Sequence, residues 1–141
     1  MDSIRKITFP VKISFIKMEL ISKIKAILFP IDKIQAVFIY GSFLDSKKYN
    51  DLDIAVFMYN DLDINFSYET LLEKKVQKAI NEKVDLRIAN KAPKSFLYEI
   101  FKGYCLFDKD DKIGDLIESV SILQMDQNYY DKMFLRELLN D

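Results

Sequence analysis

The chain has 141 residues, half of them hydrophobic, which suits a single domain with a substantial core. Its 21 basic and 22 acidic residues give a net charge of −1, without the basic excess expected of a dedicated nucleic-acid-binding protein. One cysteine and no histidine exclude an internal disulfide, a histidine general base and a cysteine–histidine zinc site. Any metal would therefore rest on oxygen ligands, which favours Mg²⁺ or Mn²⁺ over Zn²⁺.

Hydrophobic periodicity predicts alternating helices and strands. In chain order the expected elements are an extended segment over 7–15, a helix over 16–28 ended by Pro30, strands at 36–40 and 52–58, a helix over 71–80, a strand at 84–89, a helix from Pro93 to 101, a strand at 104–107, and a helical tail over 112–139 capped by Asp110 or Asp111. This order indicates one α/β or α+β domain over 1–141, with its core at about 16–111 and a C-terminal helical segment at about 112–141. No apolar run approaches the roughly 20 residues that span a bilayer. No signal-peptide cleavage site is visible, so we expect a cytoplasmic protein.

The pentapeptide NDLDI occurs twice, and its two copies have different surroundings. Asp51 and Asp53 lie at the start of the strand predicted over 52–58, where residues two apart share a face, so two carboxylates would point the same way. Ala55, next on that face, leaves room beside them. Asp61 and Asp63 have no apolar strand beneath them and are expected in a solvated turn before a helix. We therefore expect the first pair to carry any chemistry.

Two further features provide a setting for the first pair. The stretch VFIYGSF ends a buried strand at Gly41-Ser42, where a turn into a short helix would present backbone N–H groups and a hydroxyl to an anion. The stretch EKVDLRIAN places Asp85 within an apolar strand, with Arg87 on the same face. Taken singly, the first is commonly just a turn and the second a salt-bridged charge at a sheet edge. Together they combine an anion-binding turn with three carboxylates on two strands.

This set of residues resembles the nucleotidyltransferase superfamily with the DNA polymerase β-like palm, and most of all the minimal nucleotidyltransferases (MNT) that pair with HEPN toxins. The resemblance rests on Gly41-Ser42, on Asp51-Leu52-Asp53 followed by Ile-Ala-Val, and on Val84-Asp85-Leu86, and covers about residues 16–111. It implies a palm-type domain, with a small mixed sheet of about four strands flanked by helices. Two features depart from the family pattern: eight residues separate Ser42 from Asp51, and Leu-Asp-Ser stands where Ala-Arg-Gly is usual.

The resemblance also implies a mechanism. Asp51, Asp53 and Asp85 would be catalytic residues and metal ligands for two Mg²⁺ ions, with Mn²⁺ as an alternative, and Asp85 could accept the proton of the attacking hydroxyl. Gly41 and Ser42 would bind the triphosphate of ATP. Arg87 would either neutralise phosphate charge or orient Asp85. AMP would pass to a hydroxyl with loss of pyrophosphate.

The acceptor leaves three readings open. The chain has little room for an acceptor domain, so the resemblance favours a tyrosine of a HEPN toxin, with this chain as the antitoxin of a toxin–antitoxin pair and part of a hetero-oligomer. The altered Gly-Ser turn motivates a second reading, an antitoxin that neutralises its partner by binding alone. The third is a small-molecule nucleotidyltransferase. Neither direct nucleic-acid binding nor a membrane role is expected.

The C-terminal segment is rich in large apolar side chains. They belong either to the domain's own core or to a docking surface for the partner. The residues concerned are Tyr129, Tyr130, Met133, Phe134, Leu135, Leu138 and Leu139.

Overall fold

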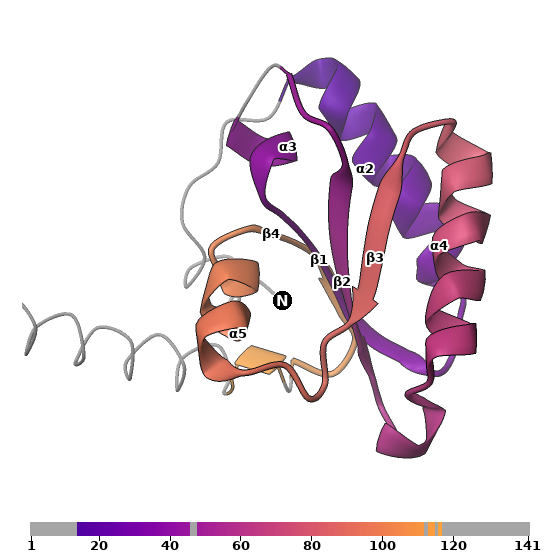
Figure 1. Ribbon diagram of the computed structural model, residues 1–141, viewed down its shortest axis with the longest axis vertical. Helices are drawn as coiled ribbons and strands as arrows, with labels where there is room; N and C mark the ends of the chain where they lie inside the picture. Colours follow the sequence, from indigo (N-terminus) through magenta and orange to yellow (C-terminus); the bar gives the residue numbers. More distant parts are fainter. Residues whose placement is uncertain (1–13, 46–47, 112, 115, 117–141) are drawn as a thin grey trace, which may run out of the picture.

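The computed structural model describes residues 14–45, 48–111, 113–114 and 116. Its elements are α2 (Phe15–Leu28), β1 (Ile34–Tyr40), α3 (Ser42–Asp45), β2 (Leu52–Met58), the 3₁₀ turn η1 (Asp61–Asp63), α4 (Phe66–Ile80), β3 (Val84–Ile88), α5 (Lys94–Phe101) and β4 (Tyr104–Asp108) (Figure 1). The predicted order of helices and strands is confirmed over this range, and β2 has the predicted bounds. No helix among the described residues is long and apolar enough to cross a membrane.

Three sequence predictions meet the edges of the described range. Phe15, which the alternating pattern assigned to an extended segment, is instead the first residue of α2, because the Ser14 hydroxyl caps this helix by accepting from the backbone N–H of Lys17. Residues 7–13 of that segment and the apolar C-terminal side chains lie outside the described residues. At the far end, the Asp108 carboxylate accepts a hydrogen bond from the backbone N–H of Ile113 at 3.1 Å, at the start of the predicted tail.

The four strands form one mixed sheet, as expected, and their order in it is β3-β2-β1-β4. Strand β1 is antiparallel to both of its neighbours, whereas β2 and β3 are parallel and are joined through α4. The register aligns three polar side chains in adjacent strands, because Tyr40 pairs with Asp53 and Asp53 pairs with Asp85. Paired residues point to the same face of a sheet. This row of three determines where the candidate site lies.

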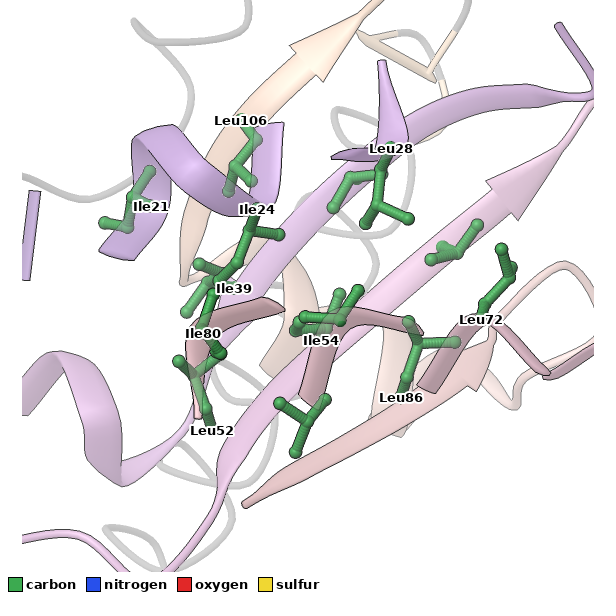
Figure 2. Close-up of a cluster of buried hydrophobic side chains, with 14 of the residues drawn as sticks. Ile21, Ile24, Leu28, Ile39, Leu52, Ile54, Leu72, Ile80, Leu86 and Leu106 are labelled. Carbon is green, nitrogen blue, oxygen red and sulfur yellow. The ribbon is translucent and has the colours of Figure 1, made fainter. Parts of the chain in front are cut away.

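The two faces of the sheet bury different apolar clusters. Leu52, Ile54 and alternate residues beyond them pack under α2 and α4, together with Ile24 and Leu72 from those helices (Figure 2). On the other face, Ala55 packs with residues of β1 and α5. Figure 1 accordingly shows α2 and α4 on one side of the sheet and α5 on the other. The predicted alternation along β2 is confirmed, and it leaves Asp53 on the α5 face.

Candidate active site

The centre of the candidate site is the row Tyr40, Asp53 and Asp85 on the α5 face of three adjacent strands. Burial and the neighbouring charges of Asp85 and Asp51 raise the pKa of the Asp53 carboxyl above its ordinary value, while Arg87 opposes this. Burial and the charges of Asp53 and Asp85 raise the pKa of Tyr40 to about 12, so its phenol stays protonated at neutral pH. The row is thus crowded with negative charge and would favour the binding of a cation.

Gly41 forms the turn that follows β1 and lies beside this row. Its φ of +82° lies in the left-handed region, which favours glycine. A Cβ built at this position would lie 2.5 Å from Oδ2 of Asp53, so any side chain here would force the carboxylate out of its present position. The chain then enters α3 with Ser42 exposed to solvent. The predicted strand–turn–short-helix arrangement is confirmed, and it places the Gly-Ser turn directly beside Asp53.

Asp51 lies just before β2, in a loop that is bonded to the loop before β3. The backbone N–H of Leu52 donates to the carbonyl of Lys83 at 2.9 Å, and the Tyr49 hydroxyl bonds the Glu82 carboxylate. These contacts tie the segment before β2 to the segment before β3. The Lys83 ammonium lies 3.5 Å from Oδ1 of Asp51, yet this buried oxygen has no hydrogen-bond partner among the described residues. An acceptor atom buried in this way is suited to ligating a cation.

Asp85 forms an ion pair with Arg87, which is one of the two roles that the sequence left open for this arginine. The Arg87 Nε lies 3.4 Å from Oδ1 of Asp85, and both side chains are partly exposed. Exposed ion pairs of this kind contribute about 0 to 1 kcal/mol, so a bound ligand can replace either partner at little cost. Lys83 and Arg87 therefore flank the three carboxylates as weakly held counter-ions.

The second NDLDI copy lies at the opposite end of β2 from the first. Asp61 and Asp63 form the turn η1, capped by the Asn60 side chain, which accepts from the N–H of Leu62. Asp63 pairs with the exposed ammonium of Lys33 at 3.6 Å. The predicted surface turn is confirmed, and the turn is separated from the Tyr40–Asp53–Asp85 row by the length of a strand.

Strand β3 is at the edge of the sheet, and side chains of α4 cover its outer backbone. Gln77, Glu73 and Glu69 are spaced four residues apart and accept from the N–H groups of Val84, Leu86 and Ile88 at 2.9, 2.9 and 2.8 Å respectively. This spacing matches the two-residue repeat of the strand, since four helical residues rise about 6 Å and two strand residues about 6.6 Å. The bonds hold the backbone on both sides of Asp85. Sequence reasoning missed them, because these three positions look like an ordinary polar helix face.

A groove lies beyond Asp85, between β3, the first half of α4 and the start of α5. It has a volume of about 540 Å³, and its lining includes Phe66, Thr70, Asp85, Arg87, Lys91 and Phe96. Phe66 is 79% exposed, and Phe96 packs edge-on against the Tyr40 ring at 5.6 Å. The groove therefore reaches Asp85, the member of the row on the edge strand. The sequence carried no signal for it, because its walls come from three elements distant in the chain.

The residues present fit a divalent cation held by oxygen. Among residues 14–45, 48–111, 113–114 and 116, no three acidic or thiol side chains already surround a common point closely enough to hold a metal ion. Side-chain rotation would therefore have to accompany ligation. Oδ1 of Asp51 lacks a hydrogen bond from any described residue, and negative charges crowd around Asp53; a bound cation would relieve both.

Comparison with known families identifies this arrangement. A family model described as Polymerase beta, Nucleotidyltransferase matches residues 22–112, which span β1 to β4 and the whole carboxylate row. The chain belongs to this nucleotidyltransferase family. No curated protein matches the chain.

Solved structures of toxin–antitoxin complexes contain chains with the same fold. A toxin–antitoxin complex MntA–HepT contains a chain that is 20% identical with a TM-score of 0.59, and the match covers 86% of this chain and 98% of that one. A tri-AMPylated Shewanella oneidensis HEPN toxin in complex with MNT antitoxin gives 22% identity and a TM-score of 0.59, with coverage of 86% and 98%. A toxin–antitoxin structure with AMP-PNP gives 22% identity and a TM-score of 0.62, with coverage of 84% and 98%.

Proposed function

We propose that this nucleotidyltransferase transfers AMP from Mg-ATP to a tyrosine hydroxyl of a HEPN-type toxin and acts as the antitoxin of that pair. The observation that carries the proposal is the row in which Asp53 lies opposite Asp85, with Gly41 packed against the Asp53 carboxylate. Among the similar structures, one holds a HEPN toxin that is AMPylated and another holds AMP-PNP. These similarities support adenosine nucleotides and a protein acceptor as the first choice.

The proposed step is an in-line displacement at the α-phosphorus. The acceptor oxygen forms a new bond to that phosphorus, and the bond from the phosphorus to the bridging oxygen of the β-phosphate breaks. The electron pair leaves with pyrophosphate. The hydroxyl proton passes to the Asp85 carboxylate, which lies on the edge strand beside the groove. Gly41 and Ser42 bind the triphosphate at the end of β1.

Asp51, Asp53 and Asp85 would hold Mg²⁺, or Mn²⁺ in its place. When bound, the metal would neutralise phosphate charge and stabilise the charge that develops on the entering and leaving oxygens. The chain's own contribution is to hold the three carboxylates in place: Gly41 packs against Asp53, the bonded loops position Asp51, and the α4 side chains fix the backbone around Asp85.

A second candidate is an antitoxin that masks its partner without catalysis. Asp45 favours it, because this exposed carboxylate ends α3, next to the turn proposed to bind a triphosphate. Repulsion between Asp45 and phosphate would weaken nucleotide binding. A small-molecule acceptor remains a third reading, in which the acceptor site is formed with another subunit.

Transfer of radiolabel from [α-³²P]ATP separates these functions. The chain is incubated with its co-expressed partner, and the label is followed into protein and into small molecules. We expect label on the partner with wild type and none with Asp53→Asn. Label in small molecules alone would favour the third reading. Partner binding without label in any product would leave only masking.

A further inference from the structure

The groove beyond Asp85 has a defined position relative to the proposed chemistry. Strand order places β1 on one side of β2 and β3 on the other, so the Gly41 turn and the groove lie on opposite sides of Asp53. Two strand spacings separate β1 from β3, or roughly 10 Å. The row of carboxylates thus has an anion-binding turn at one end and an open groove at the other.

In-line displacement gives these two ends different roles. The entering and leaving oxygens must approach and depart on opposite sides of the phosphorus. With the triphosphate on the Gly41 side, the acceptor hydroxyl must arrive from the β3 side. Asp85 lies there, and it forms part of the groove wall. The groove is therefore on the side from which the acceptor enters.

The walls of the groove favour an aromatic side chain over an added strand. The outer N–H groups of Val84, Leu86 and Ile88 are already bonded to side chains of α4, so an extended peptide finds no free donors at these positions. Phe66 offers an exposed ring at the rim, and the Phe96 ring lines the groove on the α5 side. Two aromatic rings around a groove of about 540 Å³ suit a phenol ring better than a short aliphatic hydroxyl.

We infer that this groove is the acceptor subsite and receives the tyrosine side chain of the partner protein, with its ring between Phe66 and Phe96 and its hydroxyl toward Asp85. The inference rests on the proposed function. Within it, the tyrosine oxygen forms its bond to the α-phosphorus and gives its proton to Asp85, while pyrophosphate departs on the Gly41 side. Phe66 and Thr70 are then specificity-determining residues that contact the acceptor and not the nucleotide.

The test separates acceptor binding from nucleotide binding. Phe66→Ser removes an exposed ring from the rim, and Thr70→Trp fills the groove from α4. Leu71→Ser is the matched control, because Leu71 is also an exposed apolar residue of α4, at 60%, but it does not line the groove. For each protein we would measure the KM for the co-purified HEPN-type partner, the Kd for AMP-PNP, and the chemical shifts of backbone amides on titration with N-acetyltyrosinamide.

We expect both groove variants to raise the KM for the partner by about tenfold, the loss typical of one aromatic contact. Their Kd for AMP-PNP and all properties of Leu71→Ser should stay close to wild type. N-acetyltyrosinamide should shift amides around Thr70 and Lys91 in wild type and not in Thr70→Trp. Shifts confined to another surface, or an unchanged KM in both variants, would overturn the groove assignment. If the wild-type protein transferred no AMP but still showed these amide shifts with N-acetyltyrosinamide, the proposed function would be refuted. The groove would then still be a binding site for a phenol ring.

Discussion

Gly41→Ala should separate the stability of this fold from its activity. The added methyl group would meet Oδ2 of Asp53 at 2.5 Å, and this atom is the free end of a side chain. The carboxylate can rotate away, so the clash costs the fold little but removes Asp53 from its place in the row. The remaining cost is the left-handed backbone at φ +82°, which is about 1–2 kcal/mol for a residue with a Cβ.

The assays are thermal unfolding and AMP transfer. A loss of about 1–2 kcal/mol lowers the Tm by roughly 3–8 °C in a domain of this size. Transfer should fall by about a hundredfold or more, since one misplaced catalytic group commonly costs that much. Asp111→Ala is the control for a backbone position with positive φ outside the site: Asp111 has a φ of 55° and follows β4, whose Asp108 pairs with Ala36 at the opposite end of β1 from Gly41. Because Asp111 already carries a Cβ, this exchange adds no left-handed strain, so it should change the Tm little and keep the activity. Full transfer by Gly41→Ala would refute the reasoning.

Three further predictions follow from the same contacts. Asp53→Asn should abolish AMP transfer and Asp63→Asn should leave it nearly unchanged, as measured by label transfer. The reverse result would show that the second copy of NDLDI, and not the first, carries the chemistry. Asp53→Asn should also raise the Tm at pH 7, because burial and the charges of Asp85 and Asp51 raise the pKa of this carboxyl in the folded state. Because the pKa of this carboxyl is raised in the folded state, the wild-type protein becomes more stable when the carboxyl is protonated. The difference in Tm between Asp53→Asn and wild type should therefore shrink as the pH falls through that pKa. A difference in Tm that stays constant between pH 7 and pH 3 would contradict this prediction. Glu73→Leu leaves a β3 amide without its acceptor and should cost about 1–2 kcal/mol in urea denaturation, whereas Glu73→Gln keeps an acceptor oxygen and should cost far less; equal losses would rule out this hydrogen bond.

Much of the fold follows from local patterns that the sequence displays. The strand β2 was predictable to the residue, because its run of apolar residues from Leu52 to Met58 is interrupted only by Asp53 and is bounded by polar residues on both sides. The turn at Gly41 was predictable because glycine ends an apolar run. Asp53 and Asp85 each stood out in the sequence as a carboxylate within an apolar strand, and the register of the sheet pairs them.

The missing parts depend on contacts between distant segments. The pairing of Lys83 with Asp51 requires the loops before β2 and β3 to meet, and neither residue signals the other in the sequence. The bonds from Glu69 and Glu73 to β3 look like a solvated helix face until the strand is placed beside it. The groove could not be predicted for the same reason. Sequence periodicity specifies which face a residue occupies, but not which element covers that face.

The intact mass of the partner shows directly whether this chain transfers AMP to protein. The HEPN-type protein is co-expressed and co-purified with wild type or with Asp51→Asn, an exchange that removes the negative charge of a carboxylate proposed to ligate the metal and replaces one of its two oxygens with nitrogen. The account predicts a partner mass increased by whole AMP units with wild type and unchanged with Asp51→Asn, although both proteins bind the partner. A partner that binds wild type and keeps its unmodified mass would contradict it.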